Sequence, residues 1–135
     1  QAAGMVSEAE FAVTIRDFPR AEKLLRQATE TCPDNGSYWF NLGTVCRRMD
    51  KRDDAKKAYE GAITAYGDAF DANPQDPAPL MRQIYVYALL GRADDAQATL
   101  KKAHKRFPDD DQVRGFDEDM LKQMFADPSF KALAI

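Results

Sequence analysis

A pattern of small and large residues occurs three times along the chain and restricts the fold more than any other feature of the sequence. Each copy consists of an alanine, a large apolar residue four positions later and a second alanine three positions after that. The copies begin at Ala21, Ala55 and Ala96, so the first interval is 34 residues and the second is 41. Spacings of three and four residues place side chains on one face of an α-helix. The sequence therefore predicts a tandem series of helical units.

The segments between these copies also have helical periodicity. Proline and glycine residues stand at the short breaks between periodic segments, and Asp50 and Gly91 occupy corresponding turns in the second and third units. Alanine, the strongest helix former, is abundant, whereas the alternation of apolar and polar residues that is typical of strands is rare. We therefore predict an all-α fold built from helix-turn-helix units.

The middle unit carries the most complete set of motif residues, which are small or bulky residues at fixed spacing. They are Trp39, Leu42, Gly43, Ala55, Tyr59 and Ala62. In these residues and in its 34-residue period, the chain resembles the tetratricopeptide repeat family over roughly residues 2–110. The resemblance implies a right-handed α-solenoid of stacked helix-turn-helix units, in which the small residues let helix axes approach closely. The other two units depart from the motif, with Ala9, Ala12 and Ile84 at motif positions.

No linker or low-complexity segment interrupts the chain, so we expect a single domain over residues 1–135. Its parts share the repeat pattern or close it at the end of the chain. They are three repeats at about 2–35, 36–76 and 77–110, and a capping helix and tail at 111–135.

The middle repeat is seven residues longer than the family period, and the additional length falls within residues 63–73. Seven residues are almost two helical turns, so a longer second helix would keep the same face inward. We favour this helix, with an inner face formed by Ala62, Tyr66, Ala69 and Phe70. A bulged loop is the alternative, because Gly67 weakens a helix interior.

The end of the chain has the pattern of a capping element. An apolar stripe is formed by Val113, Phe116, Met120 and Met124. A terminal helix with such a stripe and a polar outer face closes the uncovered end of a repeat array. Asp127 and Pro128 then begin a short final helix that carries Phe130 and Leu133. Docking of this last segment on another chain is the alternative.

Composition and isolated reactive residues exclude several classes of function. A net charge of −3 does not favour a nucleic-acid partner, and no apolar run is long enough for membrane insertion. Cys32, Cys46 and the single histidine do not have the spacing of a metal site, and we expect no cofactor. His104 stands at the basic end of a helix, where we expect a solvated side chain. No catalytic motif is present, so the sequence does not predict an enzyme.

The compartment is not indicated by the sequence. The chain begins at Gln1 without an initiator methionine, so we expect a processed product or an excised piece of a longer protein. The protein is expected to be soluble, and either cytoplasmic or periplasmic and exported after removal of a leader.

The resemblance implies that the first helix of each repeat lines a concave groove. The residues that we predict to form its peptide-binding surface are Phe40, Asn41, Thr44, Arg47, Met81, Arg82 and Tyr85. Further inward-facing positions are Val6, Glu10, Val13 and Leu89, with Arg48 and Lys51 at the far end of the second repeat's first helix. Aromatic residues offer contact area with little entropy loss, while asparagine and arginine bond backbone or carboxylate oxygens. Solvation of a helix end is the alternative role of Arg47 and its basic neighbours.

Some members of the family clamp the C-terminal carboxylates of a peptide. Asn41 and Arg82 match two of the five clamp positions, but Val6, Glu10 and Ala78 replace the residues needed at the others. Chaperone-tail binding of that kind is therefore not expected. Other small members act as bacterial secretion chaperones that bind extended client segments, an analogy of fold alone.

Two functions follow as hypotheses. The first is a protein-interaction module or scaffold that binds an extended peptide or a partner helix of unidentified origin in its groove. The second is a structural segment of a larger protein, either a spacer or a dimerisation unit, which allows a homodimer.

Overall fold

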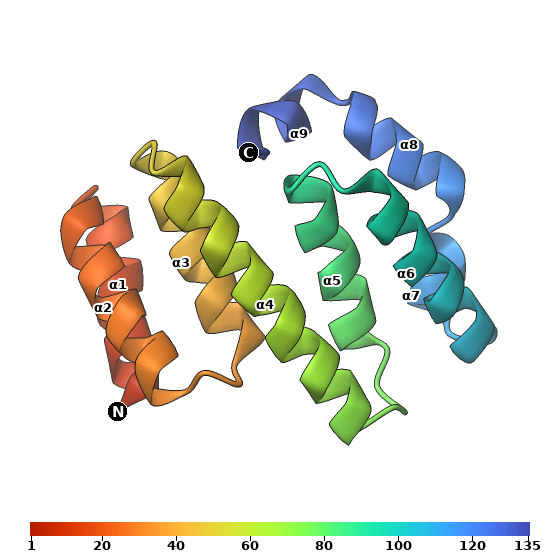
Figure 1. The fold of residues 1–135 in the computed structure, drawn as a ribbon, viewed down its shortest axis with the longest axis horizontal. Coiled ribbons are helices and arrows are strands. Elements are labelled where there is room, and N and C mark those ends of the chain that lie inside the picture. Colours follow the sequence, from red (N-terminus) through yellow and green to blue (C-terminus); the bar gives the residue numbers. More distant parts are fainter. The chain divides into compact units, whose positions relative to one another are not determined.

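The computed structural model describes all residues 1–135, and it contains helices joined by short turns without a strand (Figure 1). The helices are α1 (Ala2–Thr14), α2 (Phe18–Thr31), α3 (Gly36–Arg48), α4 (Arg52–Ala72), α5 (Ala78–Leu89), α6 (Ala93–Arg106), α7 (Asp111–Gly115), α8 (Glu118–Ala126) and α9 (Pro128–Leu133). The predicted all-α fold is confirmed.

The chain divides into two compact units, residues 1–65 and residues 66–135. Helix α4 contributes to both, because it runs without a break from Arg52 to Ala72. In the first unit α1 packs against α2, and α2 against α3; in the second unit α5 packs against α6. The expectation of a single domain stays a prediction.

The turn within each helix pair has the same backbone conformation. Arg16, Asp50 and Gly91 have φ angles of 62°, 60° and 73°. In each turn, the backbone N–H of the next residue donates to the carbonyl five positions before it, at 2.7, 2.9 and 2.9 Å. This left-handed residue with its five-residue hydrogen bond is a Schellman ending, which satisfies the last carbonyls of a helix. The turns are 34 and 41 residues apart, as are the alanine patterns.

Two glycines allow α3 and α4 to pack closely in the first unit. A Cβ atom on Gly43 would lie 2.6 Å from the Tyr59 ring, and one on Gly61 would lie 2.8 Å from the Trp39 ring. Tyr59 is 2% exposed, and its ring centroid is 5.8 Å from that of Phe40. A residue larger than glycine at position 43 would therefore clash with the Tyr59 ring, which is buried and packs against Phe40.

The predicted long helix in the middle repeat is confirmed, because α4 is continuous over 21 residues. Ala62, Tyr66 and Phe70 are buried along it, as the expected stripe requires. Ala69 is exposed, so its assignment to the inner face was wrong. Gly67 does not interrupt the helix, and a Cβ there would lie 3.1 Å from a side-chain amide on α5.

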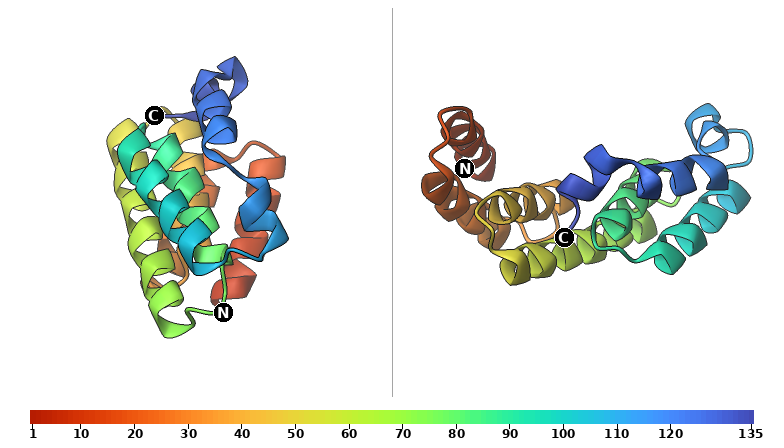
Figure 2. Two further views of the ribbon diagram at one scale, coloured as in Figure 1. Left: turned by 90° about the vertical axis from the view of Figure 1, so that its right-hand side faces the viewer. Right: turned by 90° about the horizontal axis from the view of Figure 1, so that it is seen from above.

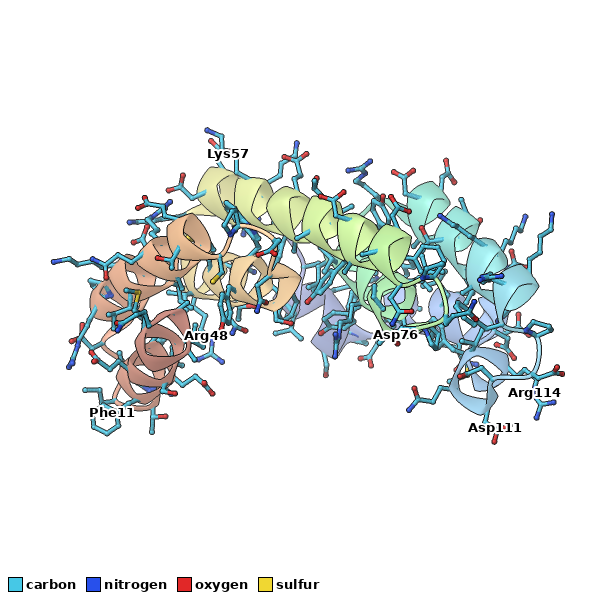
Figure 3. The ribbon with its side chains drawn as sticks, turned by 90° about the horizontal axis from the view of Figure 1, so that it is seen from below. Phe11, Arg48, Lys57, Asp76, Asp111 and Arg114 are labelled. Carbon is cyan, nitrogen blue, oxygen red and sulfur yellow. The ribbon has the colours of Figure 1, made fainter.

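Helices α7 and α8 cover the outer side of the last helix pair. Val113 of α7 is buried in a cluster with Ala103, and Leu121 of α8 is buried with Leu100 and Ile84. The apolar face of α6 is thus closed by the chain itself. Figure 3 shows Asp111 and Arg114 on the outside of α7, where they form an exposed ion pair of 2.9 Å.

The apolar stripe predicted for this terminal region was wrong at Met120, whereas Val113 is buried and Phe116 packs against a buried cluster. Met120 is 43% exposed, and the adjacent Leu121 is buried in its place. The expected stripe assumed one helix, but the helix ends at Gly115 and a new one begins after Asp117, whose carboxylate accepts the N–H of Met120 at 2.9 Å. A new N-cap changes the helical phase, which moves the buried position by one residue.

The expectation of a solvated His104 was also wrong. Its side chain is partly buried, and its Nε2 lies 3.0 Å from the carbonyl oxygen of Val113 and 2.8 Å from that of Phe116. Both partners are acceptors, so Nε2 carries the proton. His104 thereby joins α6 to the end of α7.

Candidate functional site

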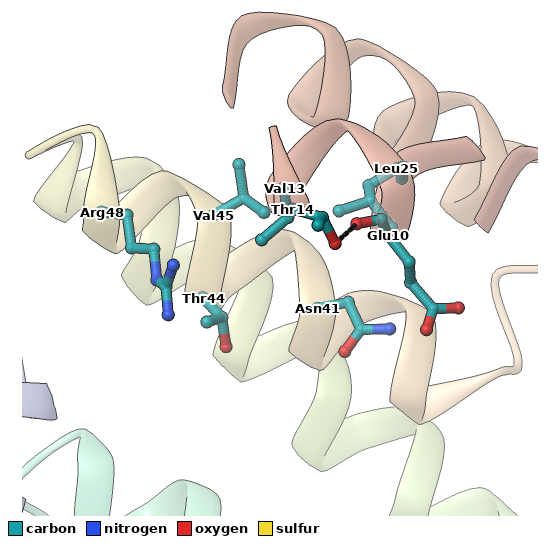
Figure 4. A pocket seen from close by; sticks show the side chains of 9 residues that line it. Glu10, Val13, Thr14, Leu25, Asn41, Thr44, Val45 and Arg48 are labelled. Carbon is teal, nitrogen blue, oxygen red and sulfur yellow. Dashed lines mark hydrogen bonds between the residues drawn. The ribbon is translucent and has the colours of Figure 1, made fainter. Parts of the chain in front are cut away.

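A cavity of about 340 Å³ opens in the first unit between α1, α2 and α3 (Figure 4). Five of its nine lining residues are polar or charged, and four are apolar. The lining residues are Ala9, Glu10, Val13, Thr14, Leu25, Asn41, Thr44, Val45 and Arg48. Clefts of this size are typical of binding sites.

Three polar residues of the cavity come from one face of α3. Asn41, Thr44 and Arg48 follow at intervals of three and four residues, which keeps them on the same side of a helix. Thr44 Oγ1 donates to the carbonyl of Phe40 at 3.1 Å and lies 3.4 Å from the hydroxyl of Tyr59. The Asn41 carboxamide has no hydrogen-bond partner within the chain, so its donors and acceptor are available to a ligand.

Opposite charges stand at the two ends of this cavity. Figure 4 shows Arg48 at one end and Glu10 at the other, with Thr44 and Asn41 between them. Neither charged side chain forms a salt bridge within the chain. The Arg48 guanidinium instead lies 5.8 Å from the centroid of the Phe18 ring. The cavity can therefore offer an acidic group, a carboxamide and a cation in sequence along its length.

The other predicted groove residues of the first unit lie outside this cavity. Phe40 packs against Tyr59 on the α4 side of α3, and both Phe40 and Arg47 are half-buried. Val6 is 8% exposed and belongs to the core rather than to a surface. Of the residues predicted in α3, Asn41, Thr44 and Arg48 therefore line the cavity.

The second unit contains the remaining three predicted residues, all on α5. Met81 packs against two buried clusters, one that contains Val113 and one that contains Leu121. Arg82 is exposed, and its guanidinium lies 6.0 Å from the centroid of the Tyr66 ring. The Tyr85 ring is edge-on to Phe130 of α9, with centroids 5.8 Å apart. This face of α5 is therefore open at Arg82 and covered at Tyr85.

Leu89 was wrongly predicted to face a groove. Its side chain is 2% exposed, and its carbonyl accepts the backbone N–H of Ile135 at 3.0 Å. The alignment of the predicted residues of α3 and α5 along one groove stays a prediction, since α3 belongs to the first unit and α5 to the second.

An ion-pair network in the first unit was not anticipated from the sequence. Glu22 of α2 is 8% exposed, and it accepts from Lys51 Nζ at 2.7 Å and from Arg26 Nη2 at 2.7 Å. Arg26 also lies 3.6 Å from Asp54 of α4. The Glu22–Arg26 pair has the helical spacing of four residues, so this ion pair can be recognised in the sequence. The contact with Lys51 depends on tertiary packing and leaves no local signal.

The charges of this network shift the pKa values of its members. The hydrogen bond from Lys51 is the main cause that lowers the pKa of Glu22, against the opposing effect of burial. The hydrogen bond to Glu22 raises the pKa of Arg26 and of Lys51. Burial raises the pKa of the neighbouring Cys46 thiol. All these residues therefore keep their neutral-pH charge states, and the network joins helices rather than exchanging protons.

The structure has neither a cluster of metal ligands nor a helix that could span a membrane. No group of three or more histidine, cysteine, aspartate or glutamate side chains is placed to hold a metal ion. None of the helices combines the length and apolar composition needed to cross a membrane.

Comparisons with known proteins agree with the repeat pattern. Two family models described as tetratricopeptide repeat match the chain, one over residues 8–55 and the other over residues 55–116. A chain in the solved structure of the CopN-Scc3 complex is similar in fold, with a TM-score of 0.54 and 20% sequence identity. The similarity covers 90% of this chain and 68% of that one. No curated protein matches the sequence.

Proposed function

Since the chain belongs to the tetratricopeptide repeat family, a non-catalytic family whose domains are typically protein-interaction modules, we propose that it binds an extended peptide or a partner helix through the first helices of its repeats. The observation that carries this proposal is the cavity of about 340 Å³ in the first unit, with the unpartnered carboxamide of Asn41 in its wall. The occurrence of a similar fold in the CopN-Scc3 complex supports protein binding as a use of this architecture.

The lining of the cavity suits a peptide backbone. A carboxamide can donate to a peptide carbonyl and accept from a peptide N–H at the same time, as Asn41 is free to do. Val13, Leu25 and Val45 provide an apolar floor for an adjacent side chain. Glu10 and Arg48 would then favour a ligand with a basic residue toward one end and an acidic residue toward the other.

The predicted residues outside the cavity have supporting roles in this proposal. Phe40 and Tyr85 supply aromatic contact, and Met81 supplies adaptable apolar surface. Arg47 and Arg82 would bond carbonyl or carboxylate oxygens of the ligand. The exposed guanidinium of Arg82 forms no salt bridge within the chain, which supports its assignment to a ligand.

A peptide-display selection on the full chain tests the proposal. Selected peptides are measured by fluorescence anisotropy against the Asn41→Ala, Arg82→Ala and Phe40→Ala variants. Loss of one charged hydrogen bond costs about 1.5–3 kcal/mol, so Arg82→Ala should weaken binding at least about 10-fold. Arg114→Ala is the matched control, because Arg114 bonds only the exposed Asp111 on the outside of α7.

Nuclear magnetic resonance on the same complexes locates the site. Chemical-shift changes are expected along α3 and at Arg82. Equal affinity of the selected peptides for all three variants and for the control would contradict the proposal, as would shift changes confined to α2 and α6.

Self-association is the second candidate function, and one observation favours it. Phe11 of α1 and Ile15, the residue that follows the helix, are 59% and 53% exposed and stand four residues apart. Figure 3 shows Phe11 pointing away from the α1–α2 pair. Light scattering over a concentration series distinguishes the two functions. A dimer that Phe11→Lys converts into a monomer supports self-association, whereas a monomer at all concentrations excludes it.

A further inference from the structure

The final helix of the chain packs on the predicted binding face of α5. Phe130 of α9 is 7% exposed, and its ring is edge-on to Tyr85 at 5.8 Å and to Phe125 at 6.2 Å. Beyond the helix, Ile135 donates its backbone N–H to the carbonyl of Leu89 at 3.0 Å. Figure 2 shows the end of the chain beside the C-terminal part of α5 in both views. An aromatic anchor and a backbone hydrogen bond thus fix α9 to α5.

The buried apolar surface that holds α9 in this position is small. The helix has six residues, far fewer than an isolated helix needs for stability in water. Phe130 is its single buried residue, and Leu133 is 54% exposed. An open hollow of about 460 Å³ lies between α8 and α9, with Met120, Met124 and Leu133 in its lining. Segments with so few buried contacts open locally at low free-energy cost.

We propose that the face of α5 around Tyr85 is a binding site for short helical segments with a phenylalanine anchor, and that α9 is a tethered occupant which a partner segment of the same chemistry displaces. This inference rests on the proposed function and specifies it for the second unit. The chemistry of the partner is given by α9 itself: an Asp-Pro helix start, a phenylalanine within the first turn and, after the last turn, a backbone N–H that donates to a carbonyl of α5. A partner that also bonds Arg82, which has no ion pair within the chain, gains a contact beyond the anchor.

Tethering gives α9 a strong advantage over a free competitor. A segment joined by a short linker has an effective concentration in the millimolar range. A free peptide with the sequence of residues 127–135 should therefore bind the unmodified chain only weakly. Weakening α9 without changing Tyr85 should increase the affinity for the same peptide.

The test uses the full chain and a fluorescein-labelled peptide, Asp-Pro-Ser-Phe-Lys-Ala-Leu-Ala-Ile, measured by fluorescence anisotropy. The Phe130→Ala chain should bind this peptide at least about 10-fold more tightly than the unmodified chain does, because its own anchor is lost. Lys131→Ala is the matched control, since Lys131 is exposed on the same helix. Its affinity for the peptide should equal that of the unmodified chain.

A second variant avoids any loss of packing. Asp127 is exposed, and its carboxylate accepts the N–H of Ser129 at 2.9 Å to cap α9. Asp127→Ala should weaken α9 without changing the core, and should tighten peptide binding about threefold or more. Adding Tyr85→Ala to the Phe130→Ala chain, or replacing the phenylalanine of the peptide by alanine, should remove binding. Equal affinity of the peptide for the unmodified, Phe130→Ala and Asp127→Ala chains would overturn the inference, as would binding that persists after Tyr85→Ala.

The outcome can be separated from that of the proposed function. Selected peptides that bind at Asn41 while the α9 peptide binds no variant would leave the proposed function intact and overturn the inference alone. Absence of peptide binding in both experiments would overturn both.

Discussion

Replacement of Gly43 by alanine tests the close packing of α3 on α4 with a single added atom. The new Cβ would lie 2.6 Å from two carbon atoms of the Tyr59 ring, well inside van der Waals contact. The ring cannot move aside freely, because it packs against Phe40 and its hydroxyl lies 3.4 Å from Thr44 Oγ1. We therefore expect α3 and α4 to separate slightly, with a loss of stability.

The magnitude is a difference between two effects. Alanine is more favourable than glycine in a helix interior by about 1 kcal/mol. Overpacking of a tight contact costs about 1–3 kcal/mol. The Gly43→Ala chain should therefore range from unchanged to about 2 kcal/mol less stable than the unmodified chain. Gly43→Leu, with three further carbon atoms, should be destabilised more strongly.

Gly4→Ala is the matched control for this experiment. Gly4 also lies in a helix, and an added Cβ there would have no neighbour within 4 Å. This variant should gain up to about 1 kcal/mol, so the two alanine variants should differ by about 1–3 kcal/mol. Urea unfolding followed by far-ultraviolet circular dichroism measures both. A Gly43→Ala chain as stable as the Gly4→Ala chain would refute the proposed steric role of Gly43.

Three further experiments probe other contacts. Glu22→Gln should cost about 1–2 kcal/mol at neutral pH. Because the folded-state pKa of Glu22 lies below its ordinary value of 4.5, the contribution of its ion pairs is present above that pH and is lost as the pH falls through the lower value. Urea unfolding at about pH 6 and about pH 3 should therefore show a smaller difference for Glu22→Gln than for the unmodified chain. Leu121→Ala should lower the free energy of unfolding by about 2–4 kcal/mol, and Met120→Ala by less than about 0.5 kcal/mol. Thermal unfolding measures both, and equal losses of stability in the two variants would contradict the register of α8. Removal of residues 112–135 should expose the apolar side of α6 and cause aggregation or partial unfolding. A truncated chain that stays monomeric in light scattering and retains its melting temperature would show that these residues do not cap the array.

The helices and their pairing could be predicted because local residues determine them. The alanine pattern gives the repeat, and Asp50 and Gly91 occupy the turns at which the helices end. The continuous α4 followed from the length of the insertion, since seven residues preserve the helical phase. Asp127 and Pro128 were recognised as a helix start for a similar reason, as both act within one turn.

The features that were missed depend on residues that are distant in sequence, or on whether one helix continues or a new helix begins with a different helical phase. His104 bonds carbonyls on α7 and beyond, and Lys51 reaches a carboxylate on α2, and neither contact has a local signature. Leu121 is buried instead of Met120 because Asp117 caps a new helix. The prediction assumed that the preceding helix continues through this position. The covering of Tyr85 by Phe130 likewise depends on the tertiary path of the last residues.

The continuity of α4 has a consequence for the cooperativity of folding. The helix runs across the boundary between the two units, which lies after Ala65. Separate unfolding of the second unit would leave the last turns of α4, with Tyr66 and Phe70, without their buried surroundings. The shared helix therefore couples the melting of one unit to that of the other, as neighbouring repeats are coupled in a one-dimensional array. Trp39 is the single tryptophan and lies in the first unit, so its fluorescence reports the unfolding of that unit. Circular dichroism reports the loss of helix in both units. Unfolding transitions that coincide in the two assays would indicate strong coupling.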